Sequence, residues 1–460
     1  MKKRIVSVLI CLAITLSFAG CLGNKYDTDF TISRMTYFAD NKEKQLTAKD
    51  AVLIDDSVKK FNYFGIKYTS DSYLKCSLTY TVKKETVREE FFLEPSKSEK
   101  DFYSFIDNAL EKAVATDLIE FTCEPLNSKK ANVKFIGFSV FFREVPKQEV
   151  FIVTGKYKLG VDLLWGGALS YLEDLDSNVE AVKVDGKIKV DSNASDRYEK
   201  RAINKNVNLI NRNDTGRLVQ QSYYGTLEAP YEPGAYMDNT WNYNPVQGGN
   251  QYNDHSKIVD IRLSEEEIYI KCRPLDWAKT KEFITPSYME AWYTIENNNV
   301  HIKCRFTDFS GYPATPRTQE LPAFYCIEPL NTFVYYDGAE PFSKDNKLVT
   351  NNTLGFWPDE GYPNFTSVEH WSAYRGEFSD SFGIGLYMPT HDTFLTGVYA
   401  RGETTEKDPS RVGPTSYIAV VKDYVFESFK PKEYDYYIST GTTDEIRNSF
   451  KEISDLVWLI

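Results

Sequence analysis

The sequence predicts a mainly β protein, with a small N-terminal β-sandwich, a large antiparallel β-domain and one C-terminal helix. Short segments alternate apolar and polar residues at period two, as half-buried strands do. These segments are rich in β-branched and aromatic residues, and clusters of Gly, Pro, Asn and Ser separate them. At 460 residues the chain also exceeds what one hydrophobic core usually organises, so we expect two domains.

The first 21 residues have the features of a secretory signal. A basic start at residues 2–4 precedes an apolar run at 5–18, and small residues lead to Gly20 and Cys21. This ending closely resembles the lipobox of bacterial lipoproteins. The resemblance implies that residues 1–20 are a signal peptide and that Cys21 carries a lipid, which anchors the chain to the cell membrane on its extracytoplasmic side. The alternative is a free secreted protein that is cleaved near Gly20.

The net charge argues against one class of partner. The chain has 54 Lys and Arg residues against 66 Asp and Glu residues, and residues 1–20 hold three of the basic residues and no acidic one, so the mature net charge is −15. Such a surface repels nucleic acid, and no basic stripe interleaved with aromatic residues offsets that repulsion. We therefore expect no nucleic acid partner.

The N-terminal part divides into a tether and a small domain. Residues 21–45 are polar and predict a tether, and residues 46–150 predict a small β-sandwich that resembles jelly-roll modules in outline. Its expected strands are 72–82, 89–96, 117–126 and 131–142. Residues 101–114 instead have apolar side chains at helical spacing, so we expect a crossing helix or a helical turn there.

Five cysteines remain after Cys11 and Cys21 are set aside. They are Cys76, Cys123, Cys272, Cys304 and Cys326, an odd number without C-x-x-C spacing, which argues against a structural zinc site. We expect neither a metal nor a cofactor. Cys76 and Cys123 fall on inward faces of expected strands and could meet; the alternative is that they are free buried cysteines.

Residues 151–460 predict the large β-domain. A hairpin is expected to turn through Gly166 and Gly167, followed by a polar surface excursion at 174–205. Further short strands are expected at 266–273, 289–296, 299–309, 321–327, 332–338, 382–389, 397–402 and 416–426. The segment 443–459 predicts a helix that Thr443 caps. Its apolar face is expected to pack on the sheets and consists of Ile446, Phe450, Ile453, Leu456 and Val457.

Three segments of this domain carry a resemblance. WGGALSYL, NLINRNDTGRLVQQSYYG and NYNPVQGG resemble the opening of the β-supersandwich found in aldose epimerases of the galactose-mutarotase type and in several polysaccharide lyases. The resemblance covers about residues 155–445. It implies a twisted antiparallel sandwich with a sugar-binding cleft on one concave face.

The stretch 208–260 alternates hydrogen-bonding and aromatic side chains, a mixture that suits a polyhydroxylated ligand. The predicted substrate-binding residues are Asn211, Arg217, Gln221, Tyr223, Tyr224, Asn244, Gln247 and Trp371. In a regular strand Arg217, Gln221 and Tyr223 would share one face, and Tyr224 would need a bulge at Gly225 to join them. The alternative is an irregular connection whose aromatic rings pack on a β-scaffold.

Acid and base chemistry on a sugar needs a histidine or carboxylate at the site. The predicted catalytic residues are His255, His370 and Glu290, with Asp308 and Glu320 as further carboxylates of interest. The alternative for each histidine is an ordinary hydrogen-bonded residue, and salt bridges explain the carboxylates equally well. No G-x-S-x-G, Walker or H-E-x-x-H motif is present. Two functions remain: a carbohydrate-active enzyme, which the sequence favours, and a non-catalytic glycan-binding lipoprotein.

Overall fold

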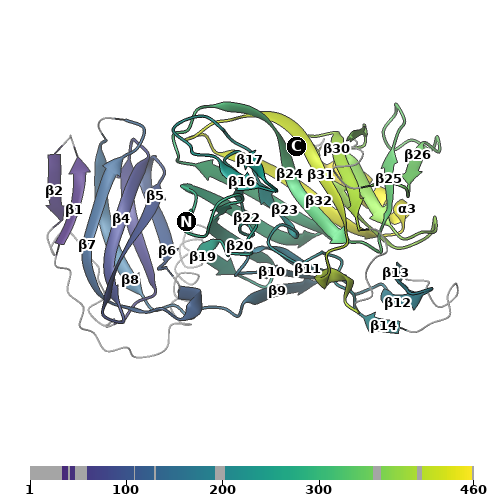
Figure 1. Cartoon of the computed structure of the whole chain (residues 1–460), viewed down its shortest axis with the longest axis horizontal. Helices are drawn as coiled ribbons and strands as arrows, with labels where there is room; N and C mark the ends of the chain where they lie inside the picture. Colours follow the sequence, from purple (N-terminus) through teal and green to yellow (C-terminus); the bar gives the residue numbers. More distant parts are fainter. Residues whose placement is uncertain are drawn as a thin grey trace, which may run out of the picture. The chain divides into compact units, whose positions relative to one another are not determined.

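The computed structural model of the chain describes residues 34–39, 42–46, 60–107, 109–128, 131–191, 202–355, 364–400 and 407–457. The predicted signal peptide and Cys21 lie outside the described residues. The chain forms two compact units, residues 1–145 and 146–460, and is mainly β, with antiparallel sheets and a helix near the C-terminus (Figure 1). Among the described helices, none has the length and apolar character needed to cross a membrane.

The first unit is a two-sheet sandwich with an aromatic core. One sheet has the order β2 (Lys42–Leu46), β1 (Arg34–Ala39), β7 (Ala115–Pro125), β4 (Leu74–Val82) and β5 (Glu85–Leu93); the other has β6 (Ser96–Phe105), β3 (Tyr63–Ser70) and β8 (Val133–Phe141). Aromatic rings from both sheets meet in the space between the sheets. The ring centroids of Phe91 and Phe64 are 5.3 Å apart, and those of Phe121 and Phe138 are 6.2 Å apart. Strands β1 and β2 fall within or next to the segment 21–45 that the sequence predicts as a tether.

The crossing helix predicted at 101–114 is wrong, and the segment contains only a helical turn. Residues 96–105 form strand β6, which pairs with β3 and brings Phe102 opposite Ile66. Phe105 and Ile106 are both buried because the chain turns inward at the end of the strand, before the short 3-10 helix η1 (Ala109–Glu111). That turn produces an apolar spacing of three to four residues, which resembles the spacing of a helix.

Two large sheets build the second unit. The ten-stranded sheet has the order β27 (Asn364–Thr366), β30 (Thr393–Tyr399), β31 (Thr415–Phe426), β24 (Thr315–Ile327), β15 (Val219–Ser222), β11 (Ala168–Asp174), β10 (Tyr157–Asp162) and β9 (Glu149–Thr154). In addition, β18 (Pro245–Val246) pairs with β15, and β21 (Leu275–Asp276) pairs with β18. The nine-stranded sheet has β19 (Lys257–Leu263), β20 (Glu267–Arg273), β22 (Ser287–Glu296), β23 (Asn299–Asp308), β32 (Lys432–Gly441), β29 (Gly383–Tyr387), β28 (Trp371–Arg375), β25 (Thr332–Tyr336) and β26 (Leu348–Asn351).

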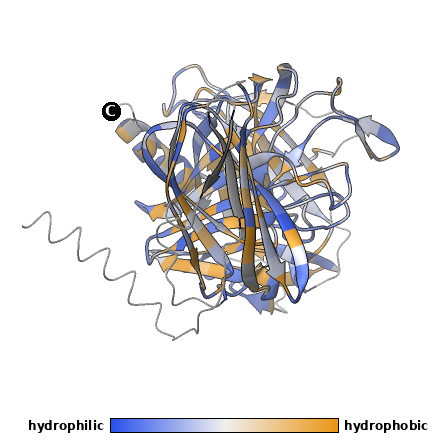
Figure 2. Cartoon of the chain, turned by 90° about the vertical axis from the view of Figure 1, so that its left-hand side faces the viewer, coloured by the Kyte–Doolittle hydropathy of each residue, from blue (hydrophilic) through white to orange (hydrophobic). Residues whose placement is uncertain are grey.

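The two sheets pack face to face. Tyr223, just after β15, stacks on Phe306 of β23 with ring centroids 4.0 Å apart, and the Tyr293 hydroxyl donates to the Gly167 carbonyl at 2.9 Å. The predicted hairpin turns through Gly166 and Gly167, both at positive φ, and a Cβ on Gly167 would collide with Ile270 of the opposite sheet. Figure 2 shows that hydrophilic and hydrophobic residues are mixed along the strands of the chain.

The second unit also contains smaller elements outside its two large sheets. The surface excursion predicted at 174–205 contains a three-stranded sheet of β12 (Glu180–Val184), β13 (Lys187–Asp191) and β14 (Ala202–Lys205). The hairpin β16 (Gly234–Tyr236) and β17 (Asn239–Trp241) lies within the polar and aromatic stretch, and the short 3-10 helix η2 (Pro409–Arg411) precedes β31.

The C-terminal helix α3 (Thr443–Val457) packs on the nine-stranded sheet. Ile446, Phe450 and Ile453 are buried against a cluster that includes Trp371 and Tyr387. Leu456, predicted on the same face, is 51% exposed.

The residue that caps α3 is Thr442, not Thr443. The Thr442 side chain accepts from the Glu445 backbone amide, and the Glu445 carboxylate accepts from the Thr442 amide at 2.8 Å. This reciprocal pair is a capping box, and Thr443 is the first residue of the helix rather than its cap.

The contact between α3 and the sheet should contribute much of the stability of the second unit. Phe450→Ala removes a fully buried ring, and we expect it to lower the free energy of unfolding by about 3–5 kcal/mol. Leu456→Ala on the same helix is the matched control and should change it by less than about 1 kcal/mol. Urea denaturation followed by circular dichroism measures both, and equal effects would contradict the described packing.

Candidate functional site

Most of the predicted ligand-binding amides are part of the scaffold. Gln221 donates to the Glu290 carbonyl at 2.9 Å, across the space between the sheets. Asn244 donates to the Tyr223 carbonyl at 2.7 Å, and Gln247 donates to the Gly166 carbonyl at 3.1 Å. These amide side chains are at most 2% exposed. They complete the hydrogen bonding of buried backbone, which leaves them no access to a ligand.

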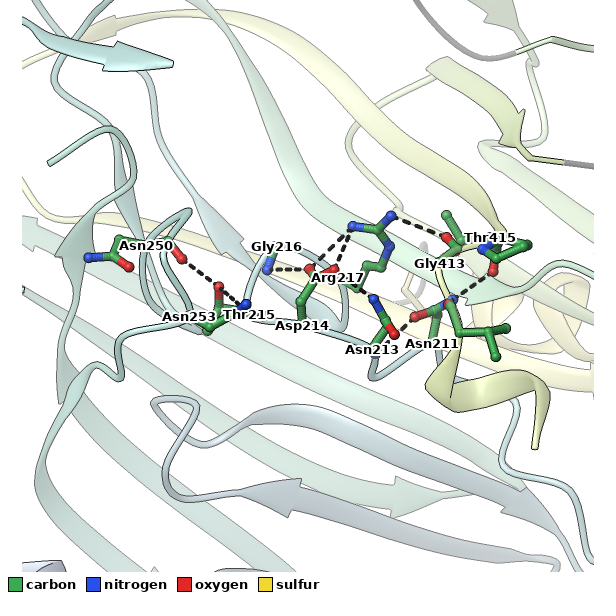
Figure 3. Close-up of polar contacts among 12 residues, drawn as sticks. Asn211, Asn213, Asp214, Thr215, Gly216, Arg217, Asn250, Asn253, Gly413 and Thr415 are labelled. Atoms are coloured by element: carbon green, nitrogen blue, oxygen red, sulfur yellow. Dashed lines mark hydrogen bonds and ion pairs between the residues drawn. The ribbon is translucent and has the colours of Figure 1, made fainter. Parts of the chain in front are cut away.

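Asn211 and Arg217 connect two loops (Figure 3). The Asn211 amide donates to the carbonyls of Val412 and Pro414 at 3.0 and 2.9 Å. The Arg217 guanidinium donates to Asp214 at 2.9 Å and to the carbonyl of residue 413 at 3.1 Å. Asn211 is fully buried, whereas the Arg217 side chain is 22% exposed. Arg217 therefore remains within reach of a ligand.

Leu218 changes which side chains share a face. Its φ of +75° interrupts the regular strand, so the alternation expected through Arg217 does not continue. Gln221 and Tyr223 point between the sheets, and Arg217 lies instead over the ring of Tyr399, at 5.8 Å from its centroid. The prediction that Arg217 goes with Gln221 and Tyr223 is wrong for this physical reason.

Tyr224 points to the opposite side from Tyr223. Its backbone amide donates to the Gln319 side chain at 2.7 Å, and Gln319 donates back to the Tyr224 carbonyl at 2.8 Å. This two-way contact fixes the Tyr224 backbone, and the half-buried Tyr224 side chain contacts the ring of Trp241 and forms a hydrogen bond with Glu320. Trp371, in contrast, is fully buried, and its indole donates to Glu369 at 2.6 Å. Trp371 belongs to the core.

The three predicted catalytic residues do not share a site. Glu290 lies on β22 and is held by the Tyr269 hydroxyl at 2.6 Å and by Arg305 at 2.7 Å. His370 precedes β28, which lies four strands from β22 in the same sheet, a separation of about 19 Å. The His370 ring contacts the Pro389 carbonyl at 2.7 Å. His255 is exposed in the loop before β19. Acid and base chemistry that combines them is not supported.

Glu320 is a carboxylate with aromatic surroundings. It lies on β24, on the outer face of the ten-stranded sheet, and accepts from the Tyr417 hydroxyl at 2.5 Å. Burial raises its pKa above the ordinary 4.5, against hydrogen bonds from Tyr417 and Tyr224 that lower it. The ring of Tyr325 lies tilted beside that of Tyr417, with the ring centroids 4.4 Å apart. We call these four residues, Tyr224, Glu320, Tyr325 and Tyr417, the Glu320 cluster.

Asp308, the remaining carboxylate of interest, is an interior group. It is 1% exposed and accepts from the Tyr243 hydroxyl at 3.0 Å and from Ser310 at 2.6 Å. Burial raises its pKa as well. Because its partners enclose it, we do not place Asp308 at a ligand site.

A row of aromatic rings leads away from the Glu320 cluster. Neighbouring rings of the row contact each other edge to face. The ring centroids are 6.4 Å apart for Tyr224 and Trp241, 5.1 Å for Trp241 and Tyr236, and 5.6 Å for Tyr236 and Trp277. All four rings are half-buried. We call them the aromatic row. Trp277 packs on Gly216, so the row ends beside the Arg217–Asp214 pair.

The sequence shows part of this arrangement. Tyr224, Tyr236 and Trp241 belong to the stretch whose composition indicates a ligand, but Trp277 and Glu320 come from other segments and only the fold brings them close. In the part of the chain that the structure describes, no group of three or more His, Cys, Asp or Glu side chains is placed to hold a metal ion.

Comparisons with known proteins give structural likenesses only. No family model matches the chain, and no curated protein matches it in sequence. Similar solved structures include a proposed aldose 1-epimerase of Escherichia coli K12, which has 7% identity and a TM-score of 0.36 and for which the match covers 64% of this chain and 99% of that chain.

Two further solved structures are similar to the chain. A galactose 1-epimerase of Lactobacillus acidophilus has 10% identity and a TM-score of 0.34, with 66% of this chain and 97% of that chain covered. A GH36 α-galactosidase of Geobacillus stearothermophilus has 9% identity and a TM-score of 0.35, with 64% of this chain and 40% of that chain covered. At these scores the likenesses carry no argument about the role of any residue here.

The raised pKa of Glu320 predicts how stability changes with pH. The folded chain keeps this proton at pH values where the unfolded chain has lost it, so the stabilising contribution is complete below about pH 4.5 and is lost as the pH rises through the raised pKa. Relative to Glu320→Gln, the wild type should therefore become less stable as the pH rises from about 4.5 through the range of the raised pKa. Urea denaturation across this range measures the difference.

The control for this experiment is Glu265→Gln, since Glu265 is an exposed carboxylate of the same unit. Its stability should follow the wild type at every pH. A constant difference between wild type and Glu320→Gln would show that Glu320 ionises as freely in the folded chain as in the unfolded one.

Proposed function

We propose that the second unit binds a carbohydrate on the outer face of its ten-stranded sheet. The observation that carries this proposal is the aromatic row, whose four half-buried rings run from the Glu320 cluster to the Arg217–Asp214 pair. A sugar presents C–H faces that pack on aromatic rings and hydroxyl groups that need hydrogen-bonding partners. A surface with rings along its length and charged groups at both ends provides both.

The polar groups beside the row have distinct roles in this proposal. The Glu320 carboxyl, protonated more readily than usual, both donates and accepts hydrogen bonds. The Arg217 guanidinium and the Asp214 carboxylate offer a donor and an acceptor close together. Their mutual contact keeps both side chains in place before a ligand arrives, which reduces the entropy lost on binding.

We further propose that the chain is a lipoprotein that presents this site outside the cell membrane. The basic start, apolar run and Gly20-Cys21 ending of the sequence support this setting. A glycan ligand is consistent with it, since extracellular polysaccharides would be accessible there.

A second candidate function is acid and base catalysis on the bound glycan. The observation that favours it is the short 2.5 Å hydrogen bond between Tyr417 and Glu320, next to a carboxyl whose pKa burial raises. A carboxyl whose pKa is raised holds its proton more tightly than an ordinary glutamate, and it can donate that proton to a glycosidic oxygen or accept one in return. Binding alone needs no such group.

The aromatic row should determine affinity for the ligand. Trp241→Ala removes a half-buried ring from the middle of the row, and we expect glycan binding to weaken about ten- to a hundredfold. Calorimetric titration against the best ligand from a glycan array measures this. Tyr252→Ala is the matched control, because Tyr252 belongs to the same stretch but is 57% exposed and outside the row. Equal affinities for wild type and Trp241→Ala would place the site elsewhere.

Glu320→Gln separates binding from catalysis. If the protein is an enzyme that uses Glu320, the variant should still bind the glycan, while the rate of product formation falls by about a hundredfold or more. Polysaccharide digestion, with products separated and examined for unsaturated uronates, measures this. A wild type that binds tightly and releases no product supports a binding protein.

The lipid anchor has its own test. Cells given a clickable fatty acid should label the wild-type chain, and Cys21→Ser should lose the label. Cys326→Ser controls for the loss of a thiol, since Cys326 is fully buried in the second unit. An unlabelled wild type found entirely in the medium would contradict the anchor.

A further inference from the structure

Two buried thiols of the first unit face each other across neighbouring strands. Cys76 of β4 and Cys123 of β7 are direct partners in the antiparallel register. Their Sγ atoms lie 3.3 Å apart, and the two residues are 1% and 2% exposed.

The backbone around this pair fits the dimensions of a disulfide. Directly opposed residues in antiparallel strands have Cα atoms about 4.5–5.5 Å apart, which lies within the range of about 4.4–6.8 Å found across disulfides. An S–S bond is about 2.05 Å long, so the two sulfur atoms need to approach by little more than about 1 Å. Rotation about the side-chain bonds covers this distance while the strands stay paired.

We propose that Cys76 and Cys123 form a structural disulfide when the chain folds in contact with a disulfide oxidant. The thiolate of one cysteine attacks a sulfur of the oxidant's disulfide, which gives a mixed disulfide and releases one oxidant thiolate. The thiolate of the other cysteine then attacks the protein sulfur of that mixed disulfide and releases the second. The protein loses two electrons and two thiol protons, and the oxidant gains them as two thiols.

The other cysteines of the described residues have no such partner. Cys272 on β20 lies opposite Met289, and Cys304 on β23 lies opposite Ala291, so strand β22 separates these two thiols. Cys326 lies opposite Ser416 in the other sheet. The odd number of cysteines is thereby explained by one disulfide and three buried thiols.

Burial determines when the bond forms. Burial also raises the pKa of the Cys76 thiol, which keeps it protonated and unreactive once the sandwich has formed. Oxidation therefore belongs to folding, when both thiols are still accessible. The cysteines are 47 residues apart in sequence, so the cross-link restricts the unfolded chain and stabilises the first unit.

Refolding tests the proposal. The full chain is unfolded in urea, refolded with oxidised and reduced glutathione, alkylated without reduction, digested and analysed by mass spectrometry. We expect a cross-linked peptide pair that contains Cys76 and Cys123 and weighs two hydrogen atoms less than the separate peptides, with Cys272, Cys304 and Cys326 alkylated. The melting temperature of the first unit should be about 5 °C or more higher than after reduction.

Variants separate the disulfide from a general effect of oxidation. Cys76→Ala and Cys123→Ala should each abolish the difference in melting temperature between oxidised and reduced protein, whereas Cys326→Ala should keep it. Cys272→Ala is a second control of the same kind. Full alkylation of Cys76 and Cys123 in refolded, cooperatively melting protein would overturn the proposal, and so would a cross-link from either of them to another cysteine.

Discussion

The short strand β15 is the element on which the large sheet depends. It has four residues, Val219–Ser222, yet it joins the strands that begin with β24 to those that begin with β11. Its register with β11 rests on the pair Leu169 and Val219. So little backbone pairing is a weak connection at the centre of a ten-stranded sheet, and side chains must complete the hydrogen bonding that the strand lacks.

Amide side chains perform this task. Gln220 accepts from the Gly248 amide at 2.7 Å, Gln221 reaches the Glu290 carbonyl, and Asn244 holds the Tyr223 carbonyl. Their composition makes the stretch look like a ligand surface, because a glycan-binding site and a buried backbone require the same donors and acceptors. Burial distinguishes the two uses. The residues left for a ligand are those that the scaffold leaves half-exposed, above all Tyr224 and Trp241.

The sequence is sufficient for the fold class and insufficient for the site. Alternation at period two predicts the mainly β fold, the Gly166–Gly167 hairpin and the C-terminal helix, because each depends on local spacing. The prediction of a helix at 101–114 is wrong because the buried residues at the end of this strand have an apolar spacing that resembles the spacing of a helix. Leu218 has a positive φ, a conformation that the presence of a leucine in a sequence does not predict.

The Glu320 cluster could not be predicted from the sequence either, because only the tertiary structure brings its residues together. Glu320 is recognisable as a carboxylate of interest, but its hydroxyl partner Tyr417 is 97 residues away and its neighbour Tyr224 belongs to a third segment. Only strand pairing between β24 and β31 puts the carboxyl beside the phenol. The predicted trio of His255, His370 and Glu290 lacks such a connection.

The use of amides at the centre of the sheet has a consequence for the conditions under which the molecule keeps its shape. Asn and Gln side chains carry no net charge, so their hydrogen bonds neither titrate nor weaken through ionic screening as pairs of charged groups do. Strand β15 should stay in register in dilute and in saline surroundings, in weak acid and in weak base. Glu320 sits on this unchanging support and is free to gain or lose its proton, so acidity can alter the chemistry of the outer face without rearranging the strands beneath it.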